Sequence, residues 1–259
     1  MKLEDMIIKD IGKTDYLQTI RLQKSLVEKR ADGEIQDMIL FSEHFPTIDF
    51  GSAVTHNTFS NLLLIEVRKK YENNDMNSIL KFLESKGILF SETVRGGGAT
   101  YIGPGQIMVY PIIDLKENFG NSLAVSEYKE AIDRIMLNVL QSFGIPAETF
   151  TVEKILGESS MRKDRKDIWI TQNNKHYKLG GKGIRVTQGI AHHGFNLYLN
   201  AESISGFRYI NACGYTPEEL GVTSIEHLLG KKIDREEFKT KIVSEFYQQL
   251  RERYAIKHN

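Results

Sequence analysis

The chain has 259 residues, of which 41% are hydrophobic and 26% are charged, and its 34 basic side chains are balanced by 34 acidic ones. This composition is typical of a folded globular protein, and it excludes a disordered chain and a partner held by strong overall charge, such as nucleic acid. The apolar runs are too short for a membrane span and the N-terminus carries acidic residues instead of a signal peptide, so we expect a cytoplasmic protein.

The first third of the chain predicts a mixture of helices and strands. Residues 15–29 carry apolar side chains at near-helical spacing, and residues 37–41 form a short apolar run typical of a buried strand. Residues 77–86 have one apolar helical face and end before Gly87, after which residues 88–90 indicate another strand. An α/β arrangement therefore begins near the N-terminus.

The middle of the chain predicts a strand followed by the clearest helix. Residues 107–115 are apolar and β-branched, but Pro111 lacks a backbone N–H, so we expect an edge or bulged strand. Residues 122–143 place apolar side chains three or four apart, and Gly144 follows as a helix end. One face of this helix is expected to cover the core.

The last third predicts further strands and a C-terminal helix. Strands are expected at residues 168–170, 177–186 and 195–199, and an amphipathic helix follows Asp234. Strands and helices do not alternate regularly and no internal repeat is visible. We therefore expect an α+β fold, with a mixed sheet packed against helices, in a single domain over residues 1–259.

A glycine-rich run occupies residues 95–106, with the sequence RGGGATYIGPGQ. Three successive glycines lack Cβ atoms, which allows positive φ angles and the close approach of a ligand to the main chain. By themselves they form a tight turn as often as a binding loop, and the Gly-Pro-Gly turn that follows favours the binding loop. The run is neither a P-loop nor a dinucleotide fingerprint, because no Lys-Ser/Thr pair follows and it leads into a strand.

Cys213 is the only cysteine, so it cannot form an internal disulfide. A lone cysteine is more often a small buried hydrophobic residue than a nucleophile. The residues around it decide between the two.

Five segments, in order, resemble those of lipoyl(octanoyl) transferases, the octanoyl-carrier-protein:protein octanoyltransferases. They are residues 43–51, residues 95–106, residues 110–115, residues 178–185 with 193–197, and residues 210–214 with 222–225. The likeness covers most of the chain between residues 40 and 228. Two departures are visible: Ile102 stands where the family usually has histidine, and Gly180 and Gly181 stand where it has alanines.

The resemblance implies that Cys213 is the nucleophile and Lys178 the general base. A thiol with a pKa of about 8.5 is only a few per cent thiolate at pH 7, and an ordinary lysine is almost fully protonated there. A buried lysine of lowered pKa can take the proton of the thiol and later that of the incoming amine. Lys182 is the competing candidate, since regular alternation along a strand puts positions 178 and 182 on the same face. Only the motif selects Lys178.

The resemblance also implies a set of substrate-binding residues: Arg95, Gly96, Gly97, Gly98, Ala99, Thr100, Tyr101, Gly180, Gly181, Lys182, Gly183, His193, Gly194 and Phe195. The residues themselves leave structural roles open for Arg95, Arg185 and His193, while His192 is expected to be an exposed neighbour. Backbone N–H groups of the glycine loop or near Gly214 are plausible donors to an oxyanion.

The implied fold is that of biotin and lipoate protein ligases, without a metal or nucleotide cofactor. The implied donor is octanoyl-acyl carrier protein, and the acceptors are lipoyl domains of 2-oxoacid dehydrogenase complexes and glycine cleavage H protein. A monomer is expected. The basic residues Arg162, Lys163, Arg165 and Lys166 form a solvated surface or receive the acidic carrier protein.

Two other functions remain open. One is an ATP-dependent lipoate ligase of the same fold, in which the cysteine would be dispensable. The other is a non-catalytic relative that binds the carrier protein or lipoyl domains, a possibility raised by Ile102.

Overall fold

The computed structural model describes residues 6–52, 76–95, 98–151, 166–210 and 221–258, with the backbone only for Met76 and residues 252–258. Its described strands form a main sheet of eight strands and a small sheet of three. The main sheet has the order β1 (Ile7–Thr14), β2 (Met38–His44), β6 (Gln106–Asp114), β10 (Ile190–Tyr198), β9 (Lys175–Thr187), β8 (Lys166–Gln172) and β7 (Glu148–Thr151), with β11 (Gly221–Val222) also paired to β9.

The small sheet has the order β4, β3, β5, formed by Leu89–Glu92, Thr47–Phe50 and Ala99–Ile102. In the main sheet β1 and β11 pair in parallel with their neighbours, whereas the other pairings are antiparallel. The mixed sheet with helices confirms the α+β expectation.

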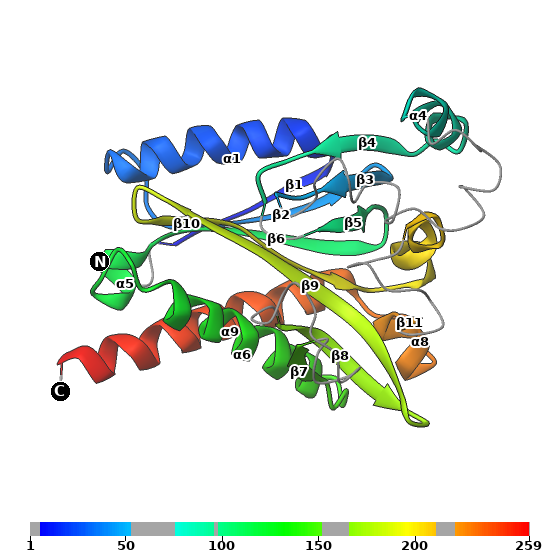
Figure 1. The fold of residues 1–259 in the computed structure, drawn as a ribbon. Helices are drawn as coiled ribbons and strands as arrows, with labels where there is room; N and C mark the ends of the chain where they lie inside the picture. Colours follow the sequence, from blue (N-terminus) through cyan, green and yellow to red (C-terminus); the bar gives the residue numbers. More distant parts are fainter. Residues whose placement is uncertain (1–5, 53–75, 96–97, 152–165, 211–220, 259) are drawn as a thin grey trace.

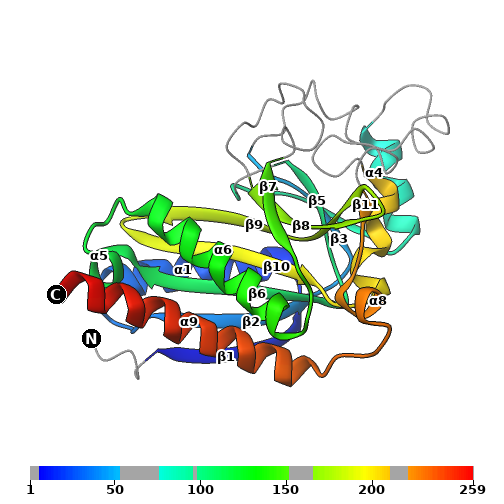
Figure 2. The same ribbon diagram turned by 90° about the horizontal axis from the view of Figure 1, so that it is seen from below.

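Helices cover both faces of the main sheet (Figures 1 and 2). The long helices α6 (Val125–Ser142) and α9 (Arg235–His258) pack on one face, which we call the α6/α9 face. The opposite face carries α1 (Tyr16–Ala31) and the small sheet, and we call it the pocket face. Shorter elements complete the chain: α4 (Met76–Ser85), α5 (Leu115–Phe119), the 3₁₀ helix η2 (Ala201–Tyr209) and α8 (Ile225–Leu229).

The predicted helices α1 and α9 begin at the side-chain hydrogen bonds, and α9 packs with the apolar stripe, that their sequences indicate. The Asp15 side chain accepts a hydrogen bond from the backbone N–H of Gln18 and begins α1. The Asp234 side chain accepts hydrogen bonds from the backbone N–H groups of Glu236 and Glu237 at the start of α9. The apolar stripe of α9 is buried against α6 and the sheet, at Phe238, Ile242, Phe246 and Leu250. No helix within the described ranges has the length and apolarity needed to cross a bilayer.

Of the two alternatives expected for the strand of Pro111, an edge strand or a bulged strand, the edge strand is wrong. Its strand, β6, is central and lies between β2 and β10. The pairing of β6 with β10 is interrupted between Ala191 and Phe195, where His193 and Gly194 have φ angles of 66° and 110°. A proline without an N–H is therefore tolerated, because the neighbouring ladder is broken at that point.

Candidate active site

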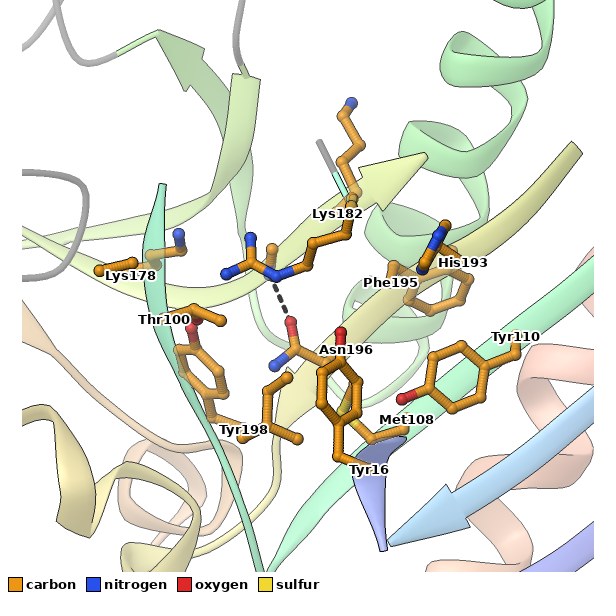
Figure 3. Close-up of a pocket in the computed structure, with 16 residues that line it drawn as sticks. Tyr16, Thr100, Met108, Tyr110, Lys178, Lys182, His193, Phe195, Asn196 and Tyr198 are labelled. Atoms are coloured by element: carbon orange, nitrogen blue, oxygen red, sulfur yellow. Dashed lines mark hydrogen bonds between the residues drawn. The ribbon is translucent and has the colours of Figure 1, made fainter. Parts of the chain in front are cut away.

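A pocket of about 550 Å³, including its part open to solvent, lies on the pocket face of the main sheet. Side chains from α1, β5, β6, β9 and β10 converge on it (Figure 3). It is lined by Tyr16, Arg95, Ala99, Thr100, Ile102, Met108, Tyr110, Lys178, Gly181, Lys182, Gly183, His193, Gly194, Phe195, Asn196 and Tyr198. Much of this lining is apolar or aromatic, as an acyl chain requires.

Most of the sequence-predicted residues meet at this pocket. Those that line it are Arg95, Ala99, Thr100, Lys178, Gly181, Lys182, Gly183, His193, Gly194 and Phe195. Gly98, Tyr101 and Gly180 do not belong to the lining. Gly96, Gly97, Cys213 and Gly214 lie outside the described residues, as do Arg162, Lys163 and Arg165.

Tyr101 faces away from the pocket, in contrast to the expected substrate contact. Thr100 and Ile102 line the pocket, and the side chain between them points to the other side of β5. There the Tyr101 ring makes an edge contact with Phe207 and covers Gly206, where a Cβ would lie only 2.1 Å from the ring. Tyr101 is thus part of the core beneath the small sheet.

Lys178 is buried at the pocket wall and is paired with Asp167 of β8. The distance from Lys178 Nζ to Asp167 Oδ2 is 2.7 Å, and the two side chains are 7% and 3% exposed. We call these two residues the pocket pair. The expected burial of Lys178 is confirmed, whereas its carboxylate partner was not anticipated. A carboxylate at this distance stabilises the ammonium form of the lysine, which opposes the effect of burial.

A β-bulge in β9 separates Lys178 from Lys182. The pairing with β8 passes from Trp169 opposite Lys178 to Ile168 opposite Gly180, so Leu179 is an extra residue on β9. The bulge shifts the alternation of side chains by one position. Positions 178 and 182 therefore lie on opposite faces, and the expectation that periodicity places them together is wrong.

The amine of Lys182 points toward the α6/α9 face, where it forms an ion pair with Asp133 of α6. In Figure 3 its side chain extends away from the pocket. We call these two residues the α6 pair. Burial lowers the pKa of Lys182 and raises that of Asp133, in each case against the attraction of the partner. Lys182 thus borders the pocket, but its charged group is directed elsewhere.

The two glycines beside Lys178 have different surroundings. A Cβ at Gly180 would lie 2.4 Å from the backbone oxygen of Asn196 and 2.8 Å from Leu197 Cδ2. A Cβ at Gly181 would lie 3.2 Å from Asp167 Oδ1 and 3.3 Å from Lys178 Nζ. Gly180 therefore permits the close approach of β9 and β10, and Gly181 leaves space around the pocket pair.

Arg95 braces the glycine loop from inside the protein. Its Nε donates to Asp49 Oδ2, and its terminal nitrogen donates to the carbonyl oxygens of Asp49 and Gly98. The hydroxyls of Ser91 and Thr93 also donate to the Asp49 carboxylate. Arg185 adds a further link, since it donates to the carbonyl of Val94 at 3.1 Å. Both arginines thus have the structural role that the sequence left open.

Two stacked histidines occupy the break in β10. The rings of His192 and His193 are 4.6 Å apart, and the backbone N–H of His193 donates to the side chain of Gln23. Both are buried, so the expectation of an exposed His192 is wrong. Burial lowers the pKa of His193 to about 3 and that of His192 to about 4, with a smaller contribution from nearby cations. Both rings are therefore neutral near pH 7.

Sequence reasoning missed several residues of the lining. They are Tyr16, Met108, Tyr110, Asn196 and Tyr198. Met108 and Tyr110 alternate on β6 and Asn196 and Tyr198 on β10, so period-two alternation would have placed each pair on one face. Tyr16 directly follows the residue that begins α1, and no local signal indicates that it reaches the pocket. Its position depends on how α1 packs on the sheet.

Hydrogen bonds fix the polar members of this wall. The Tyr110 hydroxyl is 2.6 Å from His44 Nε2. Asn196 accepts a hydrogen bond from the backbone N–H of Gly181 and donates to the side chain of Gln106. The Asn196 side chain thereby holds β9 beside Lys178, as the dashed line in Figure 3 shows.

Comparisons with known proteins find related sequences over most of the chain. The family model described as lipoyl protein ligase A/B catalytic domain matches residues 15–247. The octanoyltransferase of Koribacter versatilis is 30% identical over 237 residues, which are 92% of this chain and 81% of that protein. The octanoyltransferase of Rubrobacter xylanophilus is 30% identical over 240 residues, covering 92% of this chain and 90% of that protein.

Solved structures show the same fold. P. falciparum LipL1 in complex with lipoate has a TM-score of 0.61 at 16% identity, covering 96% of this chain and 61% of that chain. Lipoate-protein ligase A bound with ATP has a TM-score of 0.61 at 13% identity, covering 95% of this chain and 85% of that chain. At these identities the likeness concerns the fold alone.

Proposed function

The chain belongs to the lipoyl protein ligase A/B catalytic-domain family, and from this premise we propose that it moves an octanoyl group from octanoyl-acyl carrier protein to a lipoyl-domain lysine through a thioester on Cys213. The chain is an acyltransferase that acts on octanoyl or lipoyl groups. One observation carries the finer proposal: a buried lysine amine, that of Lys178, stands at the wall of a largely apolar pocket.

Acyl transfer through a thioester needs a group that exchanges protons in both half-reactions. The carrier thiol must leave as a thiol, and the acceptor amine must lose a proton when the amide forms. Lys178 is the lysine whose amine is directed to the pocket, because the β9 bulge turns Lys182 to the other face. This supports the assignment of Lys178, and the sequence resemblance supports that of Cys213.

The apolar lining supports an acyl substrate. Burial of an eight-carbon chain stabilises the complex by about 0.8 kcal/mol per CH₂, on the order of 5 kcal/mol in total. Ile102, Met108 and Tyr110 offer such a surface beside Tyr16. Ile102, where the family usually has histidine, makes this part of the wall apolar and is compatible with a bound hydrocarbon chain. The neutral histidine His193 adds no charge to it.

We also propose which partners the enzyme has and which residues form its catalytic domain. The acceptors are lipoyl domains of 2-oxoacid dehydrogenase complexes and glycine cleavage H protein, and residues 1–259 form one catalytic domain that acts as a monomer. The carrier protein docks at the basic residues 162–166. Replacement of these basic side chains by alanine should raise the KM for carrier protein and weaken its salt dependence; unchanged values would contradict the docking.

Intact-protein mass spectrometry tests the central step. Incubation with octanoyl-acyl carrier protein, without ATP, should add one octanoyl group to the wild-type chain, and Cys213→Ser should abolish that thioester. The loaded enzyme should then transfer the group to a lipoyl domain. Transfer that requires ATP and Mg²⁺ and survives Cys213→Ala would instead show a ligase reaction. Tight binding of carrier protein without any adduct would show a non-catalytic relative.

A further inference from the structure

The carboxylate of the pocket pair, that of Asp167, has no role in the acyl transfer described above. Asp167 lies near the start of β8 and reaches Lys178 across the gap between neighbouring strands, at 2.7 Å. Both side chains are almost fully buried. Two opposite charges in contact away from water interact far more strongly than the same pair on the surface. The protonation of Lys178 therefore depends on Asp167.

The neighbouring backbone is shaped to admit this pair. A methyl group at position 181 would lie 3.2 Å from Asp167 Oδ1, 3.3 Å from Lys178 Nζ and 3.4 Å from Lys178 Cε, which is tighter than ordinary contact for all three atoms. The glycine at position 181 thus leaves the space that the ion pair occupies. The N–H of Gly181 is itself held by the side chain of Asn196. Gly181 thus leaves space for the two side chains of the pocket pair, and Asn196 holds the backbone beside them.

The other charged groups around Lys178 are arranged in pairs of their own. Arg95, which also lines the pocket, forms an ion pair with Asp49. Lys182, on the same strand, is paired with Asp133 on the α6/α9 face, and the charge of Asp167 also acts to raise its pKa. His193 is neutral near pH 7. Asp167 is in direct contact with the Lys178 amine, at 2.7 Å.

From this geometry we propose, on the basis of the function proposed above, that Asp167 is a positioning residue that keeps Lys178 as an ammonium directed into the pocket. The order of proton transfers follows. In the resting enzyme Lys178 is charged, and it acts first as an acid and only then as a base. The same ammonium stabilises a thiolate that reacts at the pocket.

The two steps balance in protons and bonds. The Cys213 thiolate attacks the octanoyl thioester, a new C–S bond forms, the bond to the carrier sulfur breaks, and Lys178 gives its proton to that departing sulfur. The neutral acceptor amine then attacks the acyl-enzyme, a C–N bond forms, and the bond to the sulfur of Cys213 breaks. The neutral Lys178 takes the proton of the attacking nitrogen, which restores the thiolate and the ammonium. Neither an oxidant nor a further reactant is needed.

Asp167→Asn tests this role, since it removes the charge and keeps the shape. Single-turnover octanoylation, measured by intact mass between pH 5 and 10, should lose its activity at alkaline pH earlier than wild type, by about one pH unit or more. Competitive labelling of Lys178 with acetic anhydride, quantified on the peptide, should increase about tenfold at a fixed pH near neutrality. Asp167→Glu should restore the wild-type pH limit. The KM for carrier protein should stay near its wild-type value.

Asp133→Asn is the matched control, because it removes the carboxylate that pairs with Lys182, the other buried lysine of β9. It should change the alkaline limit of octanoylation and the labelling of Lys178 much less than Asp167→Asn does, because it leaves the contact between Lys178 and Asp167 in place. Thermal unfolding shows whether each variant is folded. If folded Asp167→Asn has wild-type labelling and pH limit, the role of Asp167 is wrong. If wild type forms no adduct but Asp167→Asn still increases the labelling, the pair stands and the proposed function fails.

Discussion

Two lysines four positions apart on β9 have similar burial and opposite surroundings. Lys178 is paired with a carboxylate of the neighbouring strand beside the pocket, whereas Lys182 is paired with a carboxylate of α6 on the other face of the sheet. The sequences around them are alike, and a regular strand would have placed them together. The extra residue of the bulge, Leu179, turns the two side chains to opposite faces of the sheet. A single bulge thus decides which of the two amines lies beside the pocket.

The largest expected difference between the two lysines is in catalysis. Lys178→Ala should lower kcat by about 10²- to 10⁴-fold, since it removes the group that exchanges protons in both steps. Lys182→Ala should keep a kcat near wild type, because its amine is directed to Asp133 and away from the pocket. Steady-state transfer to a lipoyl domain measures both variants. Equal losses in the two would contradict the separation of the faces.

Gly180 adjoins the bulge and permits the close approach of β10 to β9. Gly180→Ala should lower the free energy of unfolding by about 3 kcal/mol, because its methyl group would meet the backbone oxygen of Asn196 at 2.4 Å. Gly181→Ala is the matched control, and should cost less than about 1 kcal/mol while it crowds the pocket pair and lowers kcat. Urea unfolding followed by the fluorescence of Trp169 measures stability. Similar unfolding energies for both variants would show that Gly180 is not needed.

The α6 pair should be replaceable by apolar residues, unlike the pocket pair. Burial lowers the pKa of Lys182 and raises that of Asp133, so desolvation outweighs the mutual attraction. The double variant Asp133→Leu with Lys182→Met should leave the free energy of unfolding unchanged or raise it by about 1 kcal/mol. Its kcat should remain close to wild type. A loss of several kcal/mol would mean that the ion pair is itself stabilising.

The neutral histidines should have a smaller effect, which is on how the free energy of unfolding depends on pH. The pKa of His192 is lowered to about 4 by burial, against about 6.5 in an unfolded chain. Between these values the unfolded chain binds a proton that the folded chain does not, so stability falls as the pH decreases from about 6.5 to about 4.

Each such histidine contributes up to about 1.4 kcal/mol per pH unit to this slope. His192→Gln should therefore reduce the acid dependence of the unfolding free energy by about that amount, with no change above pH 7. Denaturant titrations at a series of pH values provide the measurement. An unchanged slope would mean that the ring of His192 is protonated in the folded state.

Much of the fold was predictable because local patterns and tertiary packing agree. The apolar stripe of α9 from Phe238 to Leu250 has helical spacing, and packing on the sheet preserves it. Pro111 was placed wrongly because its fit depends on a break in β10, which lies far away in sequence. The sequence around Pro111 shows that it cannot donate a backbone hydrogen bond, but it does not show which strand lies beside it.

The candidate site was predictable in part for the same reason. The segments that line the pocket could be recognised by resemblance, which located Lys178 and His193. Asp167 could not be found in this way, because its partner is set by the register of β8 on β9 and by the bulge. Tyr101 was assigned to the pocket although alternation along β5 turns it to the core. Side-chain direction within a motif needed the three-dimensional structure.

The anchoring of the glycine loop by Asp49 has a consequence for the dynamics of the protein. Because Arg95 connects β3 to the carbonyl of Gly98, the small sheet supports one wall of the pocket. Transient opening of that sheet would disrupt the wall, and a molecule that fills the pocket opposes such opening. The exchange of β3 and β5 amide hydrogens with deuterated solvent would then slow on binding, so that these strands report occupancy from a distance.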